Sequence, residues 1–536
     1  MSKTTVRQAE VSNRFAMIPS AQIPRSVFDR SHGYKTTFDS GYLIPFYVDE
    51  VLPGDTHTLK ANLFARLATP IVPFMDNVYL ETFFFFVPNR LVWDHWQNFM
   101  GEQVKPNAST DYLVPSFNSA SSGVAVGSLG DYFGIPTGVG GIKNINALPF
   151  RAYGLIYNEW FRDENLQDPI MCDADGVFKT GDSQDDLSAF MPVRRGKFHD
   201  YFTSALPWPQ KGESVNISLG SSIPLNLNTV VTGNGQPKIN PLNARVDELE
   251  TDGSGLIQWG GYSKVSWRDP AIKVTTTGTA DLSQALPISI NDLRQAFQVQ
   301  KLLERDARGG TRYTEILRSH FGVVSPDARL QRPEFLGGSS TRIYLNTVAQ
   351  TSSSDSTTPQ GNLSAYGVGA DSFHGFSKSF TEHGYIIGLV NVRADLSYQQ
   401  GLNRMWSRRQ RLDFYFPALA HLGEQAIMNK EIYAQGTDAD DKVFGYQERY
   451  AEMRYYPSQI TGKMRSTYSQ PLDIWHLAQK FDNLPTLSGQ FIQDNPPIKR
   501  VIANQAEPEF LLDSWITLKS IRPMPVYSVP GLVDHF

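Results

Sequence analysis

Alternating apolar and polar positions predict β-strands in two groups, one early in the chain and one late. The early group covers residues 42–51, 56–68 and 77–88, and Pro53-Gly54 predicts a turn that joins the first two as an antiparallel pair. The late group covers residues 341–347, 379–392, 446–456 and 513–521. Because residues 83–87 are four phenylalanines and a valine in succession, we expect that strand to be buried on both faces.

Two helices are predicted between the strand groups. Ser289 and Asp292 form a capping box, apolar residues recur at helical spacing from Leu293 to Ala307, and Gly309-Gly310 ends the helix. Residues 313–321 predict a second helix. The apolar stripe of the first helix could bind a partner, but such stripes more often pack on the protein's own sheet, and we favour that interpretation.

The remaining segments lack strand or helix periodicity. Residues 100–200 are rich in Gly, Ser and Pro around a short helix near 151–162, which predicts long connections and not a second core. Residues 213–280 combine Thr, Asn, Gly and Val with turn signals and are interpreted as one large surface insertion. Residues 1–35 and 522–536 are expected to be an extended arm and an extended tail.

Two strand groups separated by a long insertion are awkward for a two-domain enzyme but natural for a jelly roll. There, two four-stranded sheets form the core, and the loops between strands can grow without disturbing it. We therefore expect a mainly β protein: an eight-stranded antiparallel jelly roll with very long loop insertions and a few short helices, forming a single domain over residues 1–536.

Composition limits the classes of function. The 49 basic and 54 acidic residues give a net charge of −5, so the chain lacks the positive field of a stand-alone nucleic-acid binder, and any DNA contact must be local. Cys172 is the single cysteine, which excludes an intrachain disulfide and fits maturation in a reducing cytoplasm. No apolar run approaches the ~20 residues of a membrane-spanning helix.

Several stretches resemble the major capsid protein of the microviruses, specifically of the gokushovirus branch. They occur in order along essentially the whole chain: Ile23-Pro24-Arg25-Ser26; residues 83–88 followed by Asn89-Arg90-Leu91-Val92-Trp93; the block from Ile290-Asn291-Asp292-Leu293-Arg294 to Gly309-Gly310-Thr311-Arg312-Tyr313; Gln331-Arg332-Pro333-Glu334-Phe335; and Pro525-Val526-Tyr527-Ser528-Val529-Pro530. Such an ordered set is far more specific than one short motif.

The resemblance implies a structural protein, not an enzyme, that self-assembles into a T=1 icosahedral shell around a circular single-stranded DNA genome. It also implies a small basic DNA-packaging protein as a partner, a virion location, and assembly in the cytoplasm of a bacterial host. In this family the variable insertion projects near the threefold axes and is thought to contact a host-cell surface receptor. Residues 213–280 occupy the corresponding place, with candidate contact residues Val230, Asn234, Gly235, Leu242, Trp259 and Tyr262.

Two basic clusters are candidates for local DNA contact. Arg404, Arg408, Arg409 and Arg411 surround Trp406, a pattern that could pair with phosphates and stack on bases, although inter-subunit ion pairs would use the same residues. A second cluster carries the same ambiguity and consists of Arg194, Arg195, Lys197 and His199.

The candidates for other chemistry are few. Asp173, Asp175 and Asp182 could offer oxygen ligands to Ca²⁺, but their spacing misses the EF-hand pattern and favours a solvated acidic loop. Asp173 and Asp175 would also raise the thiol pKa of Cys172, which favours an inert cysteine. We expect no cofactor, because no zinc, nucleotide or nucleophile-elbow motif occurs. The alternatives are a carbohydrate-active β-sandwich enzyme and a monomeric glycan-binding module.

Overall fold

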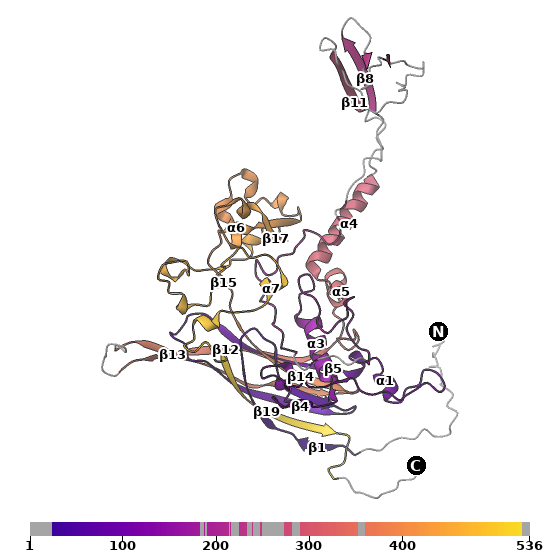
Figure 1. The fold of residues 1–536 in the computed structure, drawn as a ribbon, viewed down its shortest axis with the longest axis vertical. Coiled ribbons are helices and arrows are strands. Elements are labelled where there is room, and N and C mark those ends of the chain that lie inside the picture. Colours follow the sequence, from indigo (N-terminus) through magenta and orange to yellow (C-terminus); the bar gives the residue numbers. More distant parts are fainter. Residues whose placement is uncertain are drawn as a thin grey trace, which may run out of the picture. The chain divides into compact units, whose positions relative to one another are not determined.

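The computed structural model describes residues 24–182, 187, 190–213, 215, 225–232, 238–239, 247–248, 273–280, 290–351 and 360–527 (Figure 1). The chain divides into two compact units. The first joins Met1–Lys211 to Glu304–Phe536, and the second is Gly212–Leu303.

The first unit is organised around one antiparallel sheet of nine strands, so the predicted mainly β class is confirmed. The strand order is β1-β19-β4-β13-β12-β5-β14-β3, with β2 also paired to β19. The strands are β1 (Ser26–Asp29), β2 (His32–Phe38), β3 (Ile44–Val51), β4 (Thr56–Leu67), β5 (Val78–Pro88), β12 (Glu334–Ala349), β13 (Leu363–Ser379), β14 (Gly384–Ala394) and β19 (Phe510–Arg522).

This sheet curls into two halves that pack on each other. The β4 half consists of β2, β19, β4 and β13, with β1 paired further along the same edge of β19 as β2, and the β5 half consists of β12, β5, β14 and β3. The halves are joined where β12 pairs with β13. The order is that of a double-sheet jelly roll. It has one strand more than predicted, because β1 and β2 pair with successive parts of β19.

The predicted hairpin between residues 42–51 and 56–68 is wrong. β3 pairs with β14 in the β5 half, whereas β4 pairs with β13 and β19 in the β4 half. The turn at Pro53-Gly54 does exist, with Gly54 at φ 90° and the Asp55 carboxylate accepting the Leu52 N–H at 2.9 Å. A turn signal dictates a local reversal of direction, but the partner of each strand is set by which faces can be buried together.

The main core lies between the two halves. From β4, every second side chain is buried there, including Leu59, Leu63 and Leu67, and Phe84 and Phe86 of β5 belong to the same cluster. Phe85 and Val87 point to the opposite face of β5 and are buried in a second cluster. The expectation that residues 83–87 are buried on both faces is therefore confirmed.

That second cluster corrects the prediction that residues 100–200 hold no core of their own. Trp93, Phe117, Leu129 and Phe150 pack with Phe85 against the outer face of the β5 half. The short elements of this covering layer are α1 (Trp96–Phe99), β6 (Ser116–Phe117), α2 (Leu129–Tyr132), β7 (Ile145–Asn146), α3 (Leu148–Ile156) and η2 (Tyr157–Phe161). The apolar residues of this layer are scattered among turns, so hydrophobic periodicity in the sequence does not predict that they form a core.

The two predicted helices are confirmed as α4 (Ile290–Gly309) and α5 (Tyr313–Phe321). Ala307, which belongs to the first unit, is the one residue of α4 that is buried, and packing of the rest of the stripe on the sheet stays a prediction. Ile290, Phe297 and Leu302 are exposed. An amphipathic pattern shows that a face favours burial but does not identify the surface that would bury it.

A third cluster joins Tyr398 and Ile427, from the long connection between β14 and β19, to Tyr201 and Phe202 from the segment that follows the covering layer. The predicted strand 446–456 is shorter than expected, since β17 ends at Glu448 and Tyr450 is left-handed with φ 65°. The elements here are β15 (Ser397–Tyr398), β16 (Glu424–Met428), α6 (Asn429–Ile432), β17 (Val443–Glu448), β18 (Ser458–Gln459) and α7 (Gly489–Ile492).

The 3-10 helices are η1 (Asn89–Leu91), η4 (Arg404–Ser407), η5 (Arg411–Asp413), η6 (Pro417–Leu419), η7 (Asp438–Asp441), η8 (Ala451–Met453), η9 (Gly462–Met464), η10 (Asp473–Trp475) and η11 (Ile498–Arg500). In the second unit, β8 (Leu225–Thr232) pairs with β11 (Lys273–Ala280), and β9 (Lys238–Ile239) pairs with β10 (Asp247–Glu248). At the N-terminus, residues 26–29 and 32–35 of the expected arm lie in β1 and β2, so this part is not a free extended arm. Residues 1–23, and 528–536 of the tail, lie outside the described residues.

Candidate functional site

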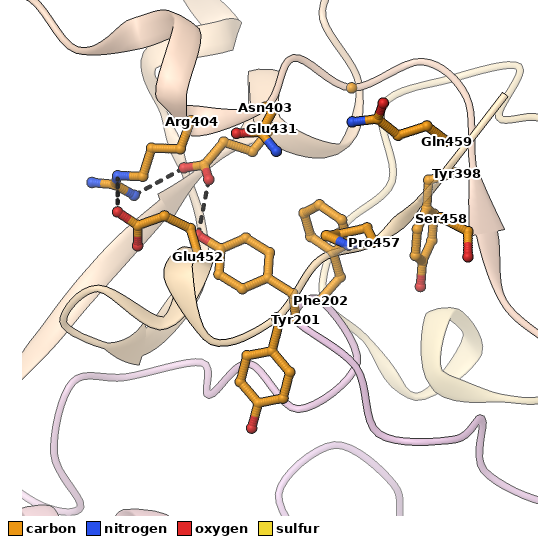
Figure 2. A pocket seen from close by; sticks show the side chains of 12 residues that line it. Tyr201, Phe202, Tyr398, Asn403, Arg404, Glu431, Glu452, Pro457, Ser458 and Gln459 are labelled. Carbon is orange, nitrogen blue, oxygen red and sulfur yellow. Dashed lines mark hydrogen bonds and ion pairs between the residues drawn. The ribbon is translucent and has the colours of Figure 1, made fainter. Parts of the chain in front are cut away.

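The basic cluster around Trp406 lies on η4 and η5, in the connection between β14 and β19. Arg404 donates to the carboxylate of Glu431 at 3.0 Å and to the Ala426 carbonyl at 2.7 Å. Arg408 donates to Glu452 at 3.0 Å. Figure 2 shows Arg404 between the two glutamates, with the Tyr201 hydroxyl donating to Glu431 at 2.9 Å from the other side.

Burial dominates the electrostatics of this network. It raises the pKa of the Glu431 carboxyl, against the opposing effect of Arg404, and it raises the pKa of the Tyr201 hydroxyl. A carboxylate in such a place needs a cationic partner, because an unpaired buried charge is strongly destabilising. Arg404 and Arg408 therefore hold the chain's own carboxylates and do not extend toward a ligand.

The pocket beside this network is lined by Tyr201, Arg404 and Tyr455 and has a volume of about 70 Å³ (Figure 2). Ligand sites for organic molecules are several times larger, and this volume suits a few water molecules. The remaining predicted residues differ from Arg404 and Arg408, because Trp406, Arg409 and Arg411 are exposed. DNA contact at these three stays a prediction.

The second basic cluster is also largely committed to intrachain contacts. Arg195 pairs with Glu81 of β5 and lies over the Phe83 ring at 5.0 Å, and Arg194 lies over the Tyr42 ring at 4.1 Å. Lys197 is buried, donates to Gln479 at 3.0 Å, and has a pKa lowered by burial to about 8. Of the cluster, His199 is the exposed member.

A larger cavity of about 640 Å³ lies beside this cluster. Its lining joins the aromatic rings of Phe83, Trp160 and Phe161 to Arg195 and Arg312. Both arginines already bind carboxylates, Arg195 that of Glu81 and Arg312 those of Glu164 and Glu315. The cavity therefore presents aromatic surface but little uncompensated charge with which to hold a phosphate.

The acidic loop makes no metal centre in the part of the chain that the structure describes. Asp173 accepts the backbone N–H groups of Asp175 and Val177, and Asp182 accepts the indole N–H of Trp93 at 2.7 Å. Across the described ranges, no group of three or more His, Cys, Asp or Glu side chains is placed to hold a metal ion. Burial raises the pKa of the half-buried Cys172 thiol, which keeps it protonated.

Of the residues predicted to contact a host, Val230 lies in β8 opposite Thr275. Asn234, Gly235, Leu242, Trp259 and Tyr262 lie outside the described residues. Among the helices that the structure describes, none has the length and apolar character needed to cross a membrane.

The sequence analysis did not predict two features of the molecular surface. One is a series of exposed apolar side chains between residues 402 and 472, and the other is a set of aromatic and basic side chains on the outer face of the β4 half. The second carried a signal, since the alternation in residues 56–68 places Lys60, Phe64 and Arg66 together on the face opposite the core. A phenylalanine on a polar face is informative because solvent is an unfavourable environment for it.

Comparison with known proteins gives a consistent result. The family model described as capsid protein (F protein) matches residues 16–532. Similar curated proteins are all named capsid protein VP1. That of Bdellovibrio phage phiMH2K is 48% identical, over 97% of this chain and 98% of its own length. That of Chlamydia phage 1 is 44% identical over 99% and 100%, and that of Spiroplasma virus 4 is 38% identical over 99% of each chain. The chain therefore belongs to the microvirus capsid protein family, as a structural and non-enzymatic component of the virion.

Proposed function

We propose that the chain self-assembles into a T=1 icosahedral shell that encloses a circular single-stranded DNA genome, and that the insertion at residues 213–280 attaches the particle to its host. The observation that carries the assembly proposal is the exposed apolar surface between β14 and β19. Monomeric proteins rarely expose so many large apolar side chains in one segment, and such surfaces mark sites of protein association.

Aromatic residues dominate this segment. Trp406 is 70% exposed and Tyr456 is 73% exposed. Other large apolar side chains of the segment are exposed as well: Leu412, Phe414, Tyr415, Leu422, Met453 and Tyr455. Trp and Tyr are enriched in the cores of protein interfaces, where large rigid side chains bury much area. In a closed shell, these residues would be covered by neighbouring copies related by symmetry.

Assembly is tested by measuring the particle mass of the expressed full-length chain. A T=1 shell of sixty 60.0 kDa chains would have a mass of about 3.6 MDa. Trp406→Asp combined with Tyr456→Asp should leave a folded monomer, seen by circular dichroism, that forms no shells in electron micrographs. The control is Gln410→Asp, which adds a charge at an exposed polar position nearby. Normal shells from the double variant would refute the assignment of this surface.

The attachment proposal is supported by the division of the chain, since Gly212–Leu303 forms a compact unit and its described strands, β8 to β11, pair among themselves. Deleting residues 225–270 should leave shell formation intact and abolish adsorption to host cells. Particles that lack this segment and still adsorb normally would refute the proposal.

A small basic DNA-packaging protein is the partner that we propose for the genome. A subunit with a net charge of −5 cannot neutralise packaged phosphates by itself, so another cation must contribute. We place synthesis and assembly in the host cytoplasm. Particles assembled without the basic protein should contain less DNA than particles assembled with it, measured by the ratio of absorbance at 260 and 280 nm.

A further inference from the structure

The outer face of the β4 half carries exposed aromatic and basic side chains. Antiparallel pairing shows which residues share this face, because directly paired residues point to the same side of a sheet. Arg66 pairs with Leu511 of β19 and with Val368 of β13, and Val368 pairs in turn with Tyr344 of β12. These four side chains therefore form one row across the strands.

The neighbouring rows repeat the pattern. Phe64 pairs with Asp513, which pairs with Lys35, and Asn62 pairs with Trp515. Lys60 follows two residues further along β4, and each such step along a strand is about 6.6 Å. Phe64 is 50% exposed and Trp515 is 53% exposed, on the side of the sheet opposite the core.

The charge on this face is positive, against the trend of a chain with net charge −5. Lys35 forms an ion pair with Asp513 at 2.8 Å, and Lys519 lies opposite Asp29. Lys60 and Arg66 are exposed and have no carboxylate partner among the residues that the structure describes. A row of unpaired cations interleaved with exposed rings is the pattern used to bind single-stranded nucleic acid.

We infer that this face, centred on Lys60, Phe64, Arg66 and Trp515, binds the backbone and bases of single-stranded DNA. The inference rests on the proposed function, because it assigns the enclosed genome to a particular surface. Phosphates would pair with the lysine and the arginine, and bases would stack on the indole and phenyl rings, without a requirement for sequence.

A neighbouring copy of the chain is the other possible occupant, and the composition of the face argues against it. The cores of protein interfaces are depleted of lysine and other charged residues, whereas Lys60 and Arg66 flank Phe64 on the same strand. Burying them under a second copy would require carboxylates opposite each. A polyanion supplies that charge throughout its length.

The test measures binding of a fluorescein-labelled oligodeoxythymidine to the unassembled full-length chain at several salt concentrations. Phe64→Ala with Trp515→Ala should weaken binding by about tenfold or more, because each lost stacking contact contributes substantially. Lys60→Gln with Arg66→Gln should also weaken binding and make the dependence of log affinity on log salt less steep by about 0.7 for each cation removed. Lys60→Arg with Arg66→Lys should bind as the parent does, since the charge is retained.

The matched control is Phe321→Ala with Arg329→Gln, which removes an exposed ring and an exposed cation from α5 and the segment after it, outside the main sheet. It should bind DNA as the parent chain does. Unchanged binding by the two sheet variants, or an equal loss in the control, would overturn the assignment.

Shell formation is followed in parallel by electron microscopy, which separates this inference from the assembly proposal. Sheet variants that form shells with reduced DNA content support the inference. Sheet variants that bind DNA normally but fail to form shells identify the face as a subunit interface and overturn it. Failure of the parent chain to form shells refutes the assembly proposal alone, because DNA binding is measured on the unassembled chain.

Discussion

The two halves of the sheet differ in what lies on their outer faces. In the β5 half, Phe85 and Val87 point outward and are buried under the covering layer built from the connection between β5 and β12. In the β4 half, Phe64 and Trp515 occupy the equivalent outward positions and are exposed. The same strand geometry thus has two outcomes: strands of one half are buried on both sides, and the other half leaves large side chains of its outer face exposed.

Removing an aromatic ring from the covered face of the β5 half should have the largest effect on the stability of the fold. Phe85 packs on Trp160 and Phe335, each at a ring distance of 5.4 Å, so Phe85→Ala leaves a cavity between the β5 half and its covering layer. We expect the free energy of unfolding to fall by about 3–5 kcal/mol, measured by urea denaturation of the unassembled chain. A loss below about 1 kcal/mol would mean that the covering layer is not a stable part of the fold.

The buried charge beneath the covering layer should have the next largest effect. Burial would raise the pKa of Glu81, but Arg195 and Arg393 outweigh burial and lower it. Arg393 donates to Glu81 at 2.8 Å. Glu81→Gln leaves Arg195 without its carboxylate partner and Arg393 with Asp395 alone, at 3.6 Å, and should destabilise the fold by about 3 kcal/mol at pH 7.

The sign of the pH dependence for Glu81 follows from its lowered pKa. A carboxyl with a lowered pKa contributes stability above its unfolded pKa and loses it as the pH falls through the folded pKa. The difference between Glu81→Gln and the parent should therefore shrink as the pH is lowered in denaturation experiments. A difference that is constant with pH would show that the carboxylate does not act through its charge.

The contribution of Asp494 to stability should depend on pH with the opposite sign to that of Glu81. Its backbone N–H donates to the Arg195 carbonyl at 2.8 Å, and burial raises its pKa from 3.8 to about 7, against the charges of Lys197, Arg195, Arg393 and Arg194. Between these two values the unfolded chain releases a proton that the folded chain retains, so stability falls as the pH rises. Asp494→Asn should stabilise the chain at pH 8, by at most about 4 kcal/mol for a pKa difference of about 3, and by nothing near pH 4, measured by thermal unfolding. Stabilisation at both pH values would contradict this account.

The smallest effect on stability is expected on the exposed face. Phe64→Ala should change the free energy of unfolding by less than about 1 kcal/mol, because half of this side chain is already in contact with water. Comparison with Phe85→Ala in the same denaturant tests the contrast between the halves directly. Equal losses would show that the two outer faces are equally important to folding.

The sequence predicted where helices and strands lie better than it predicted which distant residues they pair with. The α5 bounds, the strands that became β4 and β5, and the two-sided burial of residues 83–87 all follow from local periodicity and end signals. β13 was missed because its sequence is rich in Gly and Ser, and it is defined by long ladders with β4 and β12. The ion pairs of Arg404 and Arg408 could not be predicted either, because Glu431 and Glu452 are more than twenty residues away in the chain.

By itself, the sequence determined the β class, the two helices and the resemblance to microvirus capsid proteins, because these depend on short-range patterns and on ordered motifs. The tertiary structure alone decided that β3 and β4 belong to different halves, that residues 92–190 cover one of them, and which arginines are neutralised. The physical reason is that burial and ion pairing depend on which distant segments meet. Local periodicity shows that a face is apolar or charged, but the fold decides what that face contacts.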